Sequence, residues 1–181
     1  MKIIHVKPLM RQNTHYSKTV AQFYKDNPMK NYPLWHDDFL VCYPALLDRI
    51  GTIPQVKKVQ EIKELAEIDS QAVAPLDGAV YVIFDGMSPT DPNNGGREQV
   101  MELGFTLILA KQQYNPRPRM DGVGASLTAI CKALQGFEPE QDGRALTLSP
   151  FVQKQALAVR YFKNYALFPL RFTTTVAVMG G

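Results

Sequence analysis

The chain has 181 residues, of which 45% are hydrophobic and 20% charged, a composition that is typical of a globular protein and excludes a largely disordered one. Its net charge of +3 arises from basic residues that are scattered along the chain, so we expect no specific nucleic-acid binding. It carries neither a signal-peptide core nor an apolar run of about 18 residues, which predicts a protein with no membrane partner that stays in the cytosol where it is made.

The first 35 residues are predicted to form an N-terminal extension to a domain that spans residues 36–181. Residues 3–6 contain three β-branched side chains and suit a short edge strand. Residues 14–27 carry Tyr16, Val20, Phe23 and Tyr24 at spacings that place them on one face of a helix.

The first helix of the domain is expected from Asp37 to Ile50. An apolar stripe runs along it, and Asp37 suits the positive end of the helix dipole. Gly51 supplies a stop at its C-terminal end. Pro44 either kinks this helix or marks a restart in which the proline occupies the first helical position.

Three strand-like segments and one long loop follow this helix. Residues 56–62 fit a short strand, although 61–68 can also be read as a helical turn. Residues 78–84, GAVYVIF, are β-branched and aromatic on both faces and predict an inner strand. Residues 85–97, DGMSPTDPNNGGR, are predicted to form an exposed loop. Residues 99–111 alternate as one long strand.

The last third of the chain predicts a loop, a helix and two strands. Residues 114–120 form the loop, and residues 121–135 carry the most regular helical stripe in the sequence, with Asp121 as its N-cap and Gly136 just beyond its end. Residues 155–162 and 170–178 alternate as strands joined in an antiparallel hairpin. The order of elements predicts an α+β two-layer sandwich: a mostly antiparallel sheet of about four to five strands with two main helices on one face.

The sequence contains no local signature of a catalytic or metal site. None of the three histidines has a partner at metal-ligand spacing. Cys42 and Cys131 lie on apolar helical stripes, so we expect buried free thiols rather than a disulfide or a nucleophile. The segment GVGAS at 122–126 lacks the lysine and third glycine of a phosphate-binding loop.

Residues 91–102 partly match a calcium-binding loop. Asp91, Asn93 and Glu102 occupy positions 1, 3 and 12, and Gly96 occupies position 6. Position 5 is Gly95, which offers no side-chain oxygen, and Glu102 falls within a predicted strand. We therefore expect no metal, no cofactor and no catalytic residue in this chain.

From about Asp38 onward the chain resembles the tail terminator proteins of long-tailed bacteriophages, including those of Mu-like prophages. The resemblance lies in the arrangement of ALLDRIGTIPQV, VKKVQEI, GAVYVIF, EQVMELGFTLILAKQ, DGVGASLTAICKALQGFEP and ALAVRYFKNYALFPLRFTTTV. The phrase ICKALQGFEP, a helix that runs into a Gly-aromatic-x-Pro stop, is the most characteristic of the family. The N-terminal extension departs from the compact pattern of the family.

The resemblance implies a structural protein without cofactor or enzymatic activity. Such proteins are expected to assemble as a homo-oligomeric ring, hexameric in the family, on the end of the completed tail tube. The ring would stop polymerisation of the tube and offer a joining surface to a head-completion or neck protein. Its place would be the virion tail, reached from the cytoplasm of the bacterial host during assembly.

The long loops 85–97 and 114–120 are the predicted contacts with neighbouring subunits or with the tail tube. Ring contacts are heterologous, and charged rim residues set register and partner choice. The candidate interface residues are Asp85, Asp91, Asn93, Asn94, Arg97, Arg117 and Arg119. Two alternatives remain at this stage: a neck or stopper connector of the same architecture, and a small-molecule enzyme whose site is assembled from distant parts of the chain.

Overall fold

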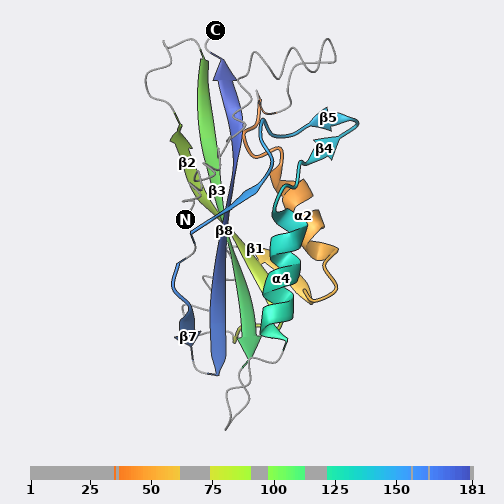
Figure 1. Cartoon of the computed structure of the whole chain (residues 1–181), viewed down its shortest axis with the longest axis vertical. Helices are drawn as coiled ribbons and strands as arrows, with labels where there is room; N and C mark the ends of the chain where they lie inside the picture. The colour runs from red at the N-terminus through yellow and green to blue at the C-terminus, as the bar shows by residue number, and fades with distance from the viewer. Residues whose placement is uncertain are drawn as a thin grey trace, which may run out of the picture.

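The computed structural model describes residues 35, 37–61, 74–90, 98–112, 122–155, 157–162 and 164–179. These residues form two layers, a strongly twisted sheet and a pair of helices packed on one of its faces (Figure 1). The helices are α2 (Tyr43–Gly51) and α4 (Val123–Leu134). The architecture confirms the predicted α+β sandwich, and within the described residues no helix is long and apolar enough to cross a membrane.

The sheet has six strands, more than the four to five expected, because two short strands pair with the last long one. Its order is β1-β2-β3-β8-β6, and β7 also pairs with β8. Only the β1–β2 pairing is parallel. The bounds are Lys58–Glu61 for β1, Ala79–Pro89 for β2, Glu98–Gln112 for β3, Val152–Lys154 for β6, Arg160–Phe162 for β7 and Tyr165–Met179 for β8. A separate hairpin pairs β4 (Glu140–Gln141) with β5 (Arg144–Ala145).

The centre of the sheet is the pair β3–β8, which stays in register from Glu98↔Met179 to Gln112↔Tyr165. Side chains alternate along a strand, so every second residue of β3 faces the helices. From Leu103 to Leu109 these residues are fully buried, together with Leu46 and Ile50 of α2 and Ile130 and Leu134 of α4. The sheet residues in this core include Val80, Val82, Leu103, Phe105, Leu107, Leu109, Leu170 and Phe172.

The two helices are tied to each other as well as to the sheet. Arg49 in the last turn of α2 donates from Nε to the carbonyl oxygen of Ala133, at 3.0 Å. Its guanidinium also lies 5.3 Å from the ring centroid of Phe137, just beyond α4, a favourable cation–π distance. The left-handed backbone of Gly136, with φ of 80°, ends α4 as the sequence predicted.

Several predicted boundaries were wrong for identifiable reasons. Helix α2 begins at Tyr43 and Pro44 is its second residue, so the helix starts one residue before the proline and not at Asp37. Strand β2 continues through a bulge to Pro89, so residues 85–89 are strand and not loop. Within the predicted strand 155–162 only β7 is a strand. The strand predicted at 170–178 is longer and starts at Tyr165.

Other predictions lie outside the described residues, including residues 1–34 of the N-terminal extension, the helical turn proposed within 61–68 beyond Glu61 and the capping role of Asp121. Trp35, the last residue of the predicted extension, is buried in the main core. The structure places Gly122 at the N-cap of α4. The division of the chain into an extension and a domain at residue 35 stays a prediction.

Candidate assembly surface

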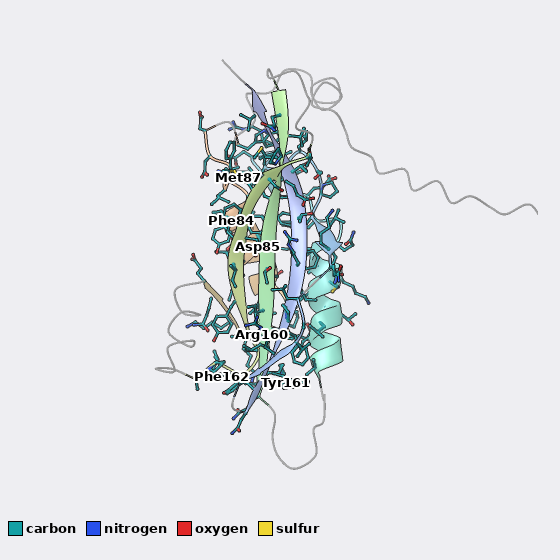
Figure 2. The ribbon with its side chains drawn as sticks, turned by 90° about the vertical axis from the view of Figure 1, so that its left-hand side faces the viewer. Phe84, Asp85, Met87, Arg160, Tyr161 and Phe162 are labelled. Atoms are coloured by element: carbon teal, nitrogen blue, oxygen red, sulfur yellow. The ribbon has the colours of Figure 1, made fainter. Side chains whose placement is uncertain are left out.

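One face of the sheet is not covered by either described helix, and its polar and apolar side chains are segregated. Figure 2 looks onto this face, with Asp85 near its middle and Arg160, Tyr161 and Phe162 of β7 at its lower end. The register pairs Thr106 with Arg171, and Asp85 of β2 forms hydrogen bonds with both. We call this side the helix-free face.

Strand β2 has a local distortion at Asp85, which strand alternation places on this face. The pairing of β2 with β3 shifts between Phe84 and Gly86, and Gly86 adopts a φ of 108°, which glycine tolerates best. Asp85 Oδ2 accepts hydrogen bonds from Thr106 Oγ1 at 2.9 Å and from Arg171 Nε at 3.1 Å. The carboxylate at the bulge therefore has one donor on β3 and one on β8.

A second ion pair lies next to the first on the same face. Glu102 Oε2 is 3.4 Å from Lys154 Nζ and accepts a hydrogen bond from Thr173 Oγ1 at 3.3 Å. Thr106 and Thr173 are buried, whereas the charged side chains above them remain partly exposed. We call this cluster the polar band; its members are Asp85, Glu102, Thr106, Lys154, Arg171 and Thr173.

The lower end of the helix-free face is apolar. Ala79, Tyr81 and Ala110 form a small buried cluster that is separate from the main core, and Ile108, Phe162 and Leu167 pack against it. Tyr81 Oη accepts a hydrogen bond from the backbone N–H of Leu76, at 3.2 Å. The cluster fixes Phe162, and with it β7, against the sheet.

Residues 157–162, which we call the edge arm, expose apolar side chains beside this cluster. Leu157 is 68% exposed, Val159 41% and Tyr161 66%. β7 pairs with β8 through Arg160↔Leu167 and Phe162↔Tyr165, so the arm lies on the β8 side of the sheet. A group of large apolar side chains this exposed is characteristic of contact surfaces.

A charged contact lies at the same end of the sheet. Asp77 lies 2.8 Å from Lys57 Nζ and 3.5 Å from Lys111 Nζ, and it accepts a hydrogen bond from the backbone N–H of Gln112. Partial burial raises the pKa of Asp77, but the two hydrogen bonds and the two lysine charges outweigh it, so the pKa is lowered overall.

The titratable groups of the described residues do not form a reactive constellation. Burial raises the pKa of the Cys42 thiol to about 12, and burial also raises that of Cys131. Both thiols are therefore protonated at neutral pH and are poor nucleophiles. No group of three or more metal-ligating side chains occurs among the described residues.

The predicted interface residues have different outcomes. Asp85 lies in strand β2 and is paired with Arg171, so it is not a loop residue. The other six candidates, Asp91, Asn93, Asn94, Arg97, Arg117 and Arg119, lie outside the described residues. Glu102, the last residue of the calcium-loop match, lies within β3 and is held by Thr173 and Lys154.

Sequence reasoning missed Arg171 and the exposed edge arm. Arg171 is a charge in an otherwise apolar and threonine-rich strand, and that contrast is a signal for a polar partner on the same face. Residues of the edge arm alternate as they would in a regular strand. The sequence therefore does not indicate that its apolar side chains are exposed.

Comparisons with known proteins give one family match and a remote structural similarity. A family model described as "Phage tail terminator protein" matches residues 36–180. Among solved structures, a chain from one titled "Virion of native gene transfer agent (GTA) particle" is 19% identical, with a TM-score of 0.37, and the match covers 73% of this chain and 84% of that one. No curated protein matches the chain significantly.

Proposed function

Because this chain belongs to the phage tail terminator family and is thus a structural protein of phage tails, we propose that it caps the completed tail tube as a homo-oligomeric ring of six copies. The ring would stop polymerisation of the tube and present the surface to which a head-completion or neck protein binds. The observation that carries this proposal is the family match, which spans residues 36–180 and so includes every described element of the fold.

The surfaces of the domain support a role in protein contacts. The helix-free face joins a polar band to an apolar end, and the edge arm adds exposed apolar side chains next to it. A charged area next to an apolar area favours a specific partner over nonspecific association. We propose that the chain catalyses no reaction and uses no cofactor.

The loops around 91–97 and 114–120 remain the proposed contacts with the tube or with a neighbouring subunit. Their charged and amide residues, Asp91, Asn93, Asn94, Arg97, Arg117 and Arg119, would set register at the rim of an interface. Shortening either loop should leave the domain folded and abolish tail binding. Unimpaired tail completion would exclude the shortened loop from the interface.

The test of capping is the length of tails made without this chain. Particles assembled in a bacterial host after deletion of its gene should carry overlong tubes without heads, and expression of the intact chain from a plasmid should restore uniform length. Electron microscopy measures both. Tubes of normal length that lack heads would contradict capping and favour a neck or stopper connector instead.

The place of the chain is tested in the same preparations. We propose that it is made in the host cytoplasm and ends in the virion tail. Antibody labelling of purified particles should place it at the head-proximal end of the tail, and labelling along the tube would contradict this position.

A further inference from the structure

A shallow groove lies at the opposite side of the sheet from the edge arm, between α2 and β1. Its volume is 610 Å³ and it is lined by Leu47, Asp48, Gly51, Thr52, Val59, Gln60 and Glu61. Gly51, the last residue of α2, has no side chain to fill it. The groove therefore combines apolar surface with two carboxylates.

Asp48 supplies an exposed carboxylate to a ligand in this groove. It has no ion pair among the described residues. Gln60 also lines the groove, but its register partner Tyr81 belongs to the apolar cluster of the helix-free face, so the Gln60 side chain points away from α2.

The edge arm carries the complementary groups. Arg160 is exposed and positively charged, and Leu157, Val159 and Tyr161 are exposed and apolar. The arm thus offers a cation for Asp48 and apolar side chains for Leu47 and Val59.

The arm cannot occupy the groove of its own chain. β2, β3 and β8 separate β1 from β7 in the sheet, so the two strands are four spacings of about 4.8 Å apart, or roughly 19 Å. The β7 pairing with β8 and the packing of Phe162 hold the arm on its own side. An arm that fills this groove therefore belongs to a second molecule.

We propose that the edge arm of one copy docks in the α2–β1 groove of the next copy and forms the subunit contact of the ring. This inference rests on the proposed ring function. The arm and the groove are different surfaces at opposite sides of the sheet, so the contact is heterologous and repeats from copy to copy. A closed ring results when the rotation between copies returns to the first one.

Chemical crosslinking of assembled tails tests the contact directly. Val159→Cys and Thr52→Cys are combined in a Cys131→Ser background, where the remaining Cys42 is fully buried, and purified particles are treated with a short bis-maleimide. The expected result is a ladder of covalent multimers of this chain. The controls carry only one of the two introduced cysteines, Val159→Cys or Thr52→Cys, in the same background, and they should give no ladder.

The other outcomes separate this inference from the capping function. Chain present on the tails without a ladder, or crosslinked only to another tail protein, would overturn the arm–groove contact and leave capping intact. Absence of the chain from the tails would overturn capping and the inference together.

Charge reversal tests the same contact by a second route. Arg160→Glu and Asp48→Lys should each lower the number of completed tails about tenfold, since they place like charges opposite each other. The double variant should recover to near the wild-type number. Lys132→Glu, an exposed reversal on α4, is the matched control and should have little effect. Loss of assembly in both single variants without recovery in the double variant would refute the pairing.

Discussion

Arg171 Nε lies 3.1 Å from Asp85 Oδ2, and the ion pair spans the intervening strand β3. It can do so because residue 104, which pairs with Thr173, is glycine. A Cβ built at Gly104 would lie 3.2 Å from both Arg171 Nη2 and Asp85 Cβ. The bulge in β2, the glycine in β3 and the arginine in β8 are therefore one arrangement that places a charged pair at the centre of the helix-free face.

Replacement of Gly104 by alanine should destabilise the domain. Alanine reduces the entropy of the unfolded chain, which favours folding, but its Cβ would crowd the ion pair and the Asp85 Cβ, which is fixed near the backbone. We expect a net loss of about 1 kcal/mol in the free energy of unfolding, measured by denaturant titration. Gly124→Ala is the control, because a Cβ there meets nothing within 4 Å; it should stabilise α4 by about 0.5–1 kcal/mol. Equal effects of the two substitutions would contradict the crowding.

Asp77 should contribute to stability at neutral pH and lose that contribution in acid. Its pKa is lowered in the folded protein, so its stabilising effect is complete above the ordinary value of 3.8 and disappears as the pH falls through the lower folded value. Because Lys57 is largely exposed, Asp77→Asn should cost only about 0.5–1 kcal/mol at pH 7.

The difference between wild type and Asp77→Asn should shrink as the pH falls below about 4, as measured by chemical unfolding at several pH values. Glu138→Gln removes an exposed carboxylate for which the described residues provide no ion pair, and it is the control. A constant difference at all pH values would show that the effect of Asp77 is not electrostatic.

Cys42 should make the domain sensitive to alkaline pH. Burial raises its folded pKa to about 12, whereas the ordinary value is 9.0. The stability that this shift provides is complete below pH 9 and is lost as the pH rises from 9 towards 12. Cys42→Ala should therefore flatten the decline of the unfolding free energy over this range, although the smaller side chain lowers stability at every pH.

Thiol labelling provides an independent measurement on the same residue. At pH 8 a thiol reagent should modify Cys131, which is only half-buried, and modify Cys42 only after unfolding. Rapid labelling of Cys42 in the folded protein would contradict its burial.

The regular parts of this fold could be predicted because their residues repeat with a clear period. β3 alternates over its whole length, and α4 keeps an apolar stripe from Val123 to Leu134 that ends at a glycine. Each element buries one face against the other layer, so apolar residues recur with the period of the helix or of the strand. The two-layer α+β arrangement follows from these elements and their order.

The rest depended on contacts between residues that are distant in the sequence. The segment that begins at Asp85 contains glycine, serine and proline and reads as a loop, yet pairing with Met101 to Gly104 keeps it in the sheet as far as Pro89. The edge arm was predicted as a strand, but β8 pairs with it only from Arg160 to Phe162. In both segments the extent of the strand depends on pairing with residues far away in the sequence, and a local sequence pattern does not predict such pairing.

Phe105 should be the residue on which the packing between sheet and helices depends most. Its ring is fully buried and lies 6.1 Å from the ring of Tyr43 on α2, 5.4 Å from Phe84 on β2 and 5.7 Å from Phe151, which precedes β6. Phe105→Ala leaves a cavity among all of these elements and should cost about 3–5 kcal/mol. Phe105→Leu should lose less, about 1–2 kcal/mol, because most of the volume is retained.

Tyr161→Ala gives the contrast that separates folding from assembly. Tyr161 is 66% exposed, so its removal should change the unfolding free energy by no more than about 0.5 kcal/mol. The same substitution should impair tail completion, because the side chain belongs to the edge arm. Thermal or chemical unfolding measures the first effect and counts of completed tails measure the second. If Tyr161→Ala unfolded the domain as severely as Phe105→Ala, the arm would be part of the core rather than a surface held ready for a second copy.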